Sequence, residues 1–252
     1  MDLMPQDPSA RRVIMILDSH DIEKCEIAGE SHTLYDRETC VIPFPVLPEG
    51  SLPAAIQNIR DANLLRPGTV VVQNPYDLDS YETPDDAPEQ FPLRKYMLFS
   101  VFCQALGARS VDIEQIDLST QNGKMSFTAE GKRLGISGNL SINADSFEKV
   151  RSNLTLNDSF DGGPADLAAA EGLLRRTKML NDPIMVGLLE ARKLSGNSLK
   201  SKTVQVNISK ETKSNLSIVA GLKIPKIISL KTDYSKIMEK FVEYNLKINI
   251  KF

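Results

Sequence analysis

A strict two-residue alternation of apolar and polar side chains at residues 245–252, NLKINIKF, constrains the fold more than any other feature. Successive side chains of a strand point to opposite faces, so this stretch predicts a strand with one buried and one solvated face. Such strands are typical of antiparallel sheets that are covered on one side only. The apolar set is Leu246, Ile248, Ile250 and Phe252, and the polar set is Lys247, Asn249 and Lys251.

A buried helix precedes several further strands of this kind. Residues 92–107 are apolar around most of a helical circumference, which predicts burial, and Gly107 is a natural stop. The first alternating run after it changes phase between Ile113 and Ile116, which indicates a bulge. The predicted strands span residues 110–118, 124–130, 134–143 and 153–158.

A second block of the sequence follows the same order. Helices are expected after Pro164 and after Pro183, and MSFTA at 125–129 matches LSIVA at 216–220. These matches predict two similar helix-plus-meander lobes, although unrelated amphipathic meanders also resemble each other. The lobes would span residues 92–160 and 161–252, with strands of the second at 202–209, 215–221, 226–233 and 244–252.

Residues 1–91 are expected to form an N-terminal α/β segment. Its proline-rich end, CVIPFPVLP, limits any strand there to a sheet edge, and residues 77–91 predict an exposed acidic loop. The whole chain is therefore predicted to be α+β, with helices packed on mainly antiparallel sheets. The expected elements of the segment are a strand at 13–17, a hairpin at 22–47, a helix at 51–65 and a strand at 69–73.

Charge and cysteine content narrow the setting. The net charge of −3 hides an acidic first part, residues 1–160, and a basic second part, residues 161–252. Such a split indicates either a match between the two parts or a face for an anionic partner. Three widely spaced cysteines give no disulfide framework, and no apolar run is long enough to span a bilayer. We expect a cytoplasmic protein without a transmembrane segment.

Both histidines and two of the three cysteines fall within residues 20–40. Because imidazole and thiolate are zinc ligands, His20, Cys25, His32 and Cys40 form a hypothetical zinc cluster. Their spacing departs from the close ligand pairs of structural zinc sites, so exposed histidines and half-buried thiols are the alternative. No other cofactor is expected.

Signatures of catalysis are weak. Asp-x-His after the first strand begins a metallophosphatase-like pattern, but the further ligands of a two-metal site are missing. Ser31 and His32 are adjacent, so on a strand they would face opposite ways, and Cys103 lies in the apolar helix as a packing residue. A hydrolase with an unrecognised site near residues 18–40 stays open as an alternative.

The C-terminal part is rich in lysine, which suggests a surface for nucleic acid or another anionic partner. Lysines favour sequence-independent contacts with phosphate over base reading. A lysine-rich solvent face over an apolar core is the alternative. The candidate lysines are Lys200, Lys202, Lys231, Lys247 and Lys251.

These patterns together favour a non-catalytic binding or scaffold protein that acts through protein–protein contacts of its sheet surfaces or edges. Opposite charge on the two parts of the chain would also allow head-to-tail self-association. Sequence-independent nucleic-acid binding by the basic C-terminal lobe is the first alternative, and the hydrolase is the second.

Overall fold

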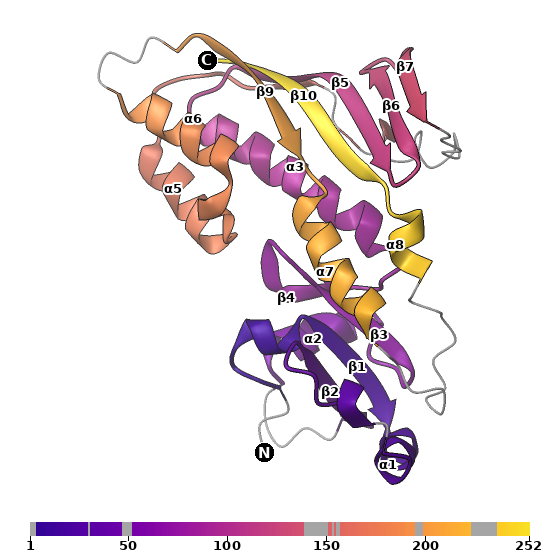
Figure 1. Cartoon of the computed structure of the whole chain (residues 1–252). Coiled ribbons are helices and arrows are strands. Elements are labelled where there is room, and N and C mark those ends of the chain that lie inside the picture. The colour runs from indigo at the N-terminus through magenta and orange to yellow at the C-terminus, as the bar shows by residue number, and fades with distance from the viewer. Residues whose placement is uncertain are drawn as a thin grey trace. The chain divides into compact units, whose positions relative to one another are not determined.

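The structure is a computed structural model that describes residues 4–29, 31–46, 52–138, 151–152, 154, 157–194, 199–222 and 236–252. It confirms the α+β class, with two mainly antiparallel sheets and several helices (Figure 1). The chain divides into two compact units. The first unit is Met1–Pro88 with Glu211–Lys240, and the second unit is Glu89–Lys210 with Phe241–Phe252.

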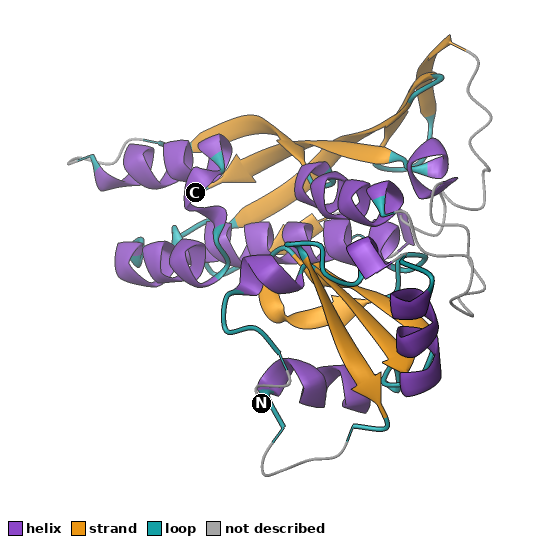
Figure 2. Cartoon of the chain, turned by 60° about the horizontal axis from the view of Figure 1, so that its bottom comes forward, coloured by secondary structure: helices purple, strands orange, loops and turns teal. Residues whose placement is uncertain are grey.

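The first unit is built on a four-stranded sheet in the order β2-β1-β3-β4, a twisted fan of strands in Figure 2. Strand β1 is central and its five apolar residues have no exposed surface, as expected for a strand covered on both faces. The core beneath it includes Ile56 and Ile59 of helix α2. The elements are β1 (Val13–Asp18), α1 (Ser19–Ile27), β2 (Thr39–Phe44), α2 (Ala54–Asp61), β3 (Thr69–Asn74) and β4 (Asp77–Glu82).

The predicted hairpin at residues 22–47 is wrong. Helix α1 occupies its first part, and β2 pairs with β1 in parallel, an arrangement that requires a crossover connection. Asp18 begins the helix, because its carboxylate accepts a hydrogen bond from the Asp21 amide at 2.8 Å. The prolines do confine β2 to an edge of the sheet, as predicted.

The predicted acidic loop at residues 77–91 is also wrong. Residues 77–82 form β4, and helix α3 begins at Ala87. Tyr81 anchors the strand, since it is buried and its hydroxyl donates to the Arg11 carbonyl at 3.1 Å. The six acidic side chains of the stretch concealed its two buried aromatic residues, Tyr81 and Phe91.

The second unit contains a six-stranded sheet in the order β7-β6-β5-β10-β9, with β8 beside β5. Strand β10 alternates as predicted, with Leu246, Ile248 and Ile250 buried. The predicted bulge is confirmed, because the β5–β10 register skips Glu114. The strands are β5 (Ser110–Thr120), β6 (Gly123–Thr128), β7 (Arg133–Gly138), β8 (Asn157–Ser159), β9 (Ser201–Asn207) and β10 (Glu243–Lys251).

Helices cover the apolar face of this sheet, and α3 runs along it (Figure 1). Phe99 and Phe102 of α3 are fully buried, whereas Met97 and Val101 form an exposed stripe. Gly107 ends the helical segment with a φ of 83°, and a Cβ there would collide with the Gly163 carbonyl. The helices of this unit are α3 (Ala87–Ala105, whose first two residues belong to the first unit), α5 (Leu167–Arg176) and α6 (Pro183–Lys193).

The predicted strand at residues 215–221 is wrong, because this stretch lies in helix α7 (Lys210–Gly221). The buried residues Thr212, Asn215, Leu216 and Val219 follow the three-and-four spacing of a helix. Asn215 is held in the first unit, where its side-chain amide donates to the Gln73 carbonyl at 2.8 Å. The short helix α8 (Ile237–Lys240) belongs to the same unit.

The duplication hypothesis has no support in the residues that the structure describes. The first four residues of MSFTA lie in strand β6, whereas LSIVA lies in helix α7, so the matched segments differ in structure. Strands from both predicted lobes, 92–160 and 161–252, also join one sheet through the β5–β10 pair. The predicted strand at 226–233 and the second half of the strand predicted at 134–143, residues 139–143, lie outside the described residues.

None of the described helices combines the length and the apolar character needed to cross a membrane.

Candidate functional site

The four residues of the hypothetical zinc cluster are placed by different elements of the first unit. His20 lies exposed near the start of α1, and Cys25 is buried on the same helix. His32 is exposed in a short 3₁₀ helix, and Cys40 is buried in β2. Within the described part of the chain, no three His, Cys, Asp or Glu side chains come close enough to hold a metal ion.

The thiols have the properties of packing residues. Burial raises the pKa of Cys40 to about 11, with a smaller opposing effect of the Arg11 charge. Burial also raises the pKa of Cys103, and the nearby Asp158 carboxylate adds to this rise. Because the thiolate is the nucleophile and the metal ligand, a raised pKa disfavours both roles for these thiols at neutral pH.

The predicted lysine surface is divided between the two faces of the second sheet. Lys202 lies opposite Ile250 of β10, at the end of β9, and therefore belongs to the apolar face of the sheet. Lys200, two residues earlier, belongs to the same face. Lys247 and Lys251 alternate with the buried residues of β10 and therefore lie on the opposite, polar face of the sheet. Lys231 lies outside the described residues.

Polar side chains of three neighbouring strands cover the face of this sheet opposite to α3. All are exposed or half-buried, and we call them the polar face. Residues Thr203, Asn249 and Asp112 illustrate one row across β9, β10 and β5. The polar face consists of Asp112, Glu114, Gln115 and Asp117 on β5, Asn245, Lys247, Asn249 and Lys251 on β10, and Thr203, Gln205 and Asn207 on β9.

Charges on the polar face are paired within it. The Lys247 ammonium lies 2.9 Å from a Glu114 carboxylate oxygen, and the Lys251 ammonium lies 3.7 Å from Asp112. These pairs are solvent-exposed, so each adds little to stability. Their effect on recognition is larger, since they cancel the positive potential that the lysines alone would create.

Neutral polar groups complete the pattern. The Gln115 side-chain amide donates to the Asp117 carboxylate at 2.6 Å, and the Ser110 hydroxyl donates to Asp112 at 2.8 Å. These contacts orient two of the three carboxylates of the polar face. The arrangement offers ordered donors and acceptors to a partner, with no accumulation of one charge.

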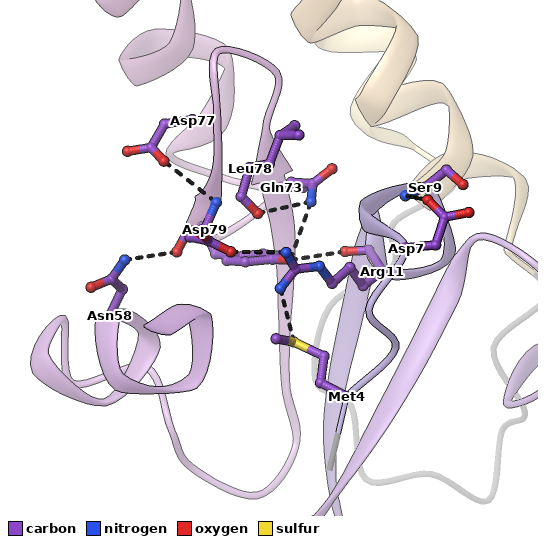
Figure 3. Close-up of polar contacts among 10 residues, drawn as sticks. Met4, Asp7, Ser9, Arg11, Asn58, Gln73, Asp77, Leu78 and Asp79 are labelled. Atoms are coloured by element: carbon purple, nitrogen blue, oxygen red, sulfur yellow. Dashed lines mark hydrogen bonds and ion pairs between the residues drawn. The ribbon is translucent and has the colours of Figure 1, made fainter. Parts of the chain in front are cut away.

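The sequence interpretation missed a buried guanidinium in the first unit (Figure 3). Arg11 is largely buried, and it donates to the Asp79 carboxylate at 2.8 Å and to the Met4 sulfur at 3.4 Å. Its Nε is buried without a hydrogen-bond partner. Asp79 is fixed in turn, because the Asn58 amide donates to its carbonyl at 2.9 Å. The group ties the chain before β1 to β4, which is a structural role.

Two further polar groups lie in the second unit. The Tyr96 and Ser100 hydroxyls of α3 both donate to the Asp158 carboxylate of β8, at 3.2 and 2.5 Å. The Lys95 ammonium lies 3.0 Å from the Asp182 carboxylate, and both side chains are buried. The helical spacing of Tyr96 and Ser100 was visible in the sequence, but their distant partners Asp158 and Asp182 were not.

The chain matches no protein-family model, no curated protein and no solved structure.

Proposed function

We propose that this chain is a non-catalytic binding protein that docks another protein on the polar face of its six-stranded sheet. The observation that carries the proposal is the internal pairing of charge on that face, Lys247 with Glu114 and Lys251 with Asp112. A surface with paired charges and ordered amides recognises a partner by the pattern of its hydrogen bonds.

A nucleic-acid partner fits this face less well. Binding to phosphates depends on lysine and arginine charges that are free to replace counterions. The polar face carries Asp112, Glu114 and Asp117 against only Lys247 and Lys251, so its net charge is not positive. Lys200 and Lys202 do not contribute to the charge of the polar face, because they lie on the other face of the sheet.

The chemistry of the predicted catalytic candidates also supports a binding role. Asp18, which begins the Asp-x-His pattern, caps helix α1, and Cys40 is buried with a raised pKa. All three cysteines are buried, and an odd number of widely spaced cysteines offers no disulfide framework, which suits a reducing compartment, so we extend the proposal to a cytoplasmic location.

Site-specific photo-crosslinking in the source cells tests the proposal. A photoreactive amino acid replaces Asn249, at the centre of the polar face, and a matched variant carries it at Glu23, an exposed position on α1. We expect one protein to crosslink reproducibly to position 249 and not to position 23.

Binding of that protein should then weaken when the polar face is altered. An Asn245→Arg substitution removes one amide of the same face and places a bulky charge opposite Asp117, and we expect about tenfold weaker binding. Equal crosslinking at both positions, or crosslinks to nucleic acid alone, would remove the proposed function.

A further inference from the structure

The two edge strands of the six-stranded sheet differ in how well they could pair with a further strand. An open edge presents unpaired backbone N–H and C=O groups, and proteins usually blunt it with bulges, glycines or charges. Strand β7 is blunted in this way. Its register with β6 shifts beside Leu134, and it contains Gly135, Gly138 and Arg133.

Strand β9 has none of these protections except one charge. It contains no glycine or proline, and its register with β10 is unbroken from Ser201 to Asn207. Lys202 is its one charged residue. Among the residues that the structure describes, β10 is the sole neighbour of β9 in the sheet.

The hydrogen bonds to β10 identify the backbone groups that point outward from β9. The Ile208 amide donates to the Tyr244 carbonyl at 3.0 Å, and the Phe252 amide donates to the Lys200 carbonyl at 2.9 Å. In an antiparallel ladder, hydrogen-bonded residues alternate with residues that face the other side. Even-numbered residues of β9 therefore face β10, and Thr203 and Gln205 direct their N–H and C=O groups to the open edge.

We propose that this edge pairs with β9 of a second copy of the chain, antiparallel and with the twofold axis at Gln205. The proposal goes beyond the polar-face function, because it concerns the edge of the sheet and a different partner. Gln205 would lie opposite its own counterpart, and Thr203 opposite Asn207 of the second copy. Paired polar side chains of this kind stabilise neighbouring strands.

The positions of the apolar residues along β9 favour this register over its neighbours. Val204 and Val206 are buried on the helix-covered face, and the axis at Gln205 places each opposite the other valine of the second copy. An axis at Val204 would instead place Val206 opposite a lysine. In the proposed register Lys202 lies at the outer end of the ladder, opposite Ile208 of the second copy, so the two lysines do not meet.

Hydrogen exchange and solution mass test the pairing without a substitution. We expect a concentration-dependent dimer, and the Thr203 and Gln205 amides should exchange more slowly at high concentration, while that of Val204 stays unchanged. A protein that remains a monomer at every concentration, or a dimer with no added protection at these two amides, overturns the proposal.

Substitutions at Gln205 test the partner and the register. Gln205→Pro removes only an outward N–H, so it should leave the β10 ladder intact and weaken dimerisation at least about tenfold. Gln205→Thr keeps the N–H and should retain the dimer. Equal thermal midpoints of the two monomers show that both variants fold.

Charge exchange completes the test. Gln205→Lys and Gln205→Glu should each dimerise about fivefold more weakly than the native chain, because like charges then lie opposite each other. A mixture of the two variants should restore the affinity. No recovery in the mixture, or protection of these amides by a different protein in place of the second copy, rules out self-pairing at this edge.

Discussion

At the scale of the residue, the few buried charged side chains affect the stability of the fold more than the many exposed ones. Arg11 keeps only 9% of its side chain exposed, whereas its partner Asp79 is 47% exposed. The two residues therefore differ in what each would lose without the other. An unpaired Asp79 can be hydrated, but an unpaired Arg11 cannot.

The asymmetry predicts unequal costs for the two substitutions. Asp79→Ala leaves the buried guanidinium without its carboxylate, and we expect a loss of about 3 kcal/mol of unfolding free energy. Arg11→Met keeps the apolar contacts and removes the unpartnered Nε, so the loss should stay below about 1 kcal/mol. Urea unfolding measures both, and equal losses would contradict this account.

Cys40 predicts an alkaline loss of stability. The pKa of the thiol rises from 9.0 in the unfolded chain to about 11 in the folded protein, because the thiol is buried. Unfolding therefore releases a proton between these values, and stability falls as the pH rises through them. In Cys40→Ala the decline should be shallower by about 1 kcal/mol per pH unit.

The slope is the relevant measurement, since the substitution also removes core volume at every pH. Urea unfolding at about pH 9 and about pH 11 gives the slope for each protein. Parallel declines in both proteins would show that the thiol ionises as readily in the folded protein as in the unfolded chain.

At the scale of the element, helix α6 depends on one carboxylate with two functions. Asp182 accepts hydrogen bonds from the Ile184 and Met185 amides at 3.0 and 3.2 Å, and the same side chain is paired with buried Lys95. The start of α6 is thereby connected to α3 by charge as well as by packing.

Two substitutions at this position separate the functions. Asp182→Asn keeps the cap but loses the charge, and we expect a loss of about 3 kcal/mol. Asp182→Ala loses both, and about 1 kcal/mol more should be lost. Thermal and urea unfolding of the two variants measure the difference, and an equal cost would show that the cap contributes nothing.

The elements also show what a sequence pattern can predict. The alternation of β10 and the bulge in β5 were both readable, because each follows from side-chain parity within one strand. Helix α7 was not readable, because Leu216, Ile218 and Ala220 alternate as in a strand. The residues that are buried in the structure include Asn215 and Val219, which have helical spacing. The contact of Asn215 with Gln73 comes from a distant segment, and no local pattern contains it.

The polar face was predicted only in part for the same reason. Lys247 and Lys251 were identified, but their partners Glu114 and Asp112 lie on a strand far away in the sequence. A candidate basic surface thus became one without net positive charge, through pairing that the sequence does not show.

At the scale of the whole molecule, the acidic first part and the basic second part of the chain meet within the second unit. Strand β5 comes from the acidic part and β10 from the basic part, and they form adjacent strands of one sheet. For these two strands, the opposite charges of the two parts of the chain neutralise each other within one sheet, which we call the internal match.

The internal match predicts how the protein behaves toward polyanions. The native chain should bind heparin weakly at low salt, and the double variant Asp112→Asn, Glu114→Gln should bind about tenfold more tightly. Removing the two carboxylates leaves Lys247 and Lys251 free to contact sulfate groups. A matched double variant on another element, Glu23→Gln with Glu26→Gln on α1, has the same net charge and controls for it.

Affinity chromatography on heparin measures all three proteins. Equal retention of the two double variants would show that net charge alone decides the interaction, and strong retention of the native chain would contradict the internal match.

The central place of β10 in its sheet has a consequence for synthesis of the chain. Strand β5 leaves the ribosome long before β10, yet Lys251 pairs with Ser110 and β9 has only β10 beside it among the described strands. During translation β9 therefore waits without a partner strand and β5, paired on one side with β6 and β8, waits with its other edge open. This condition slows folding and exposes both strands to aggregation. Binding of a chaperone to the nascent second unit would protect it until β10 is inserted between them.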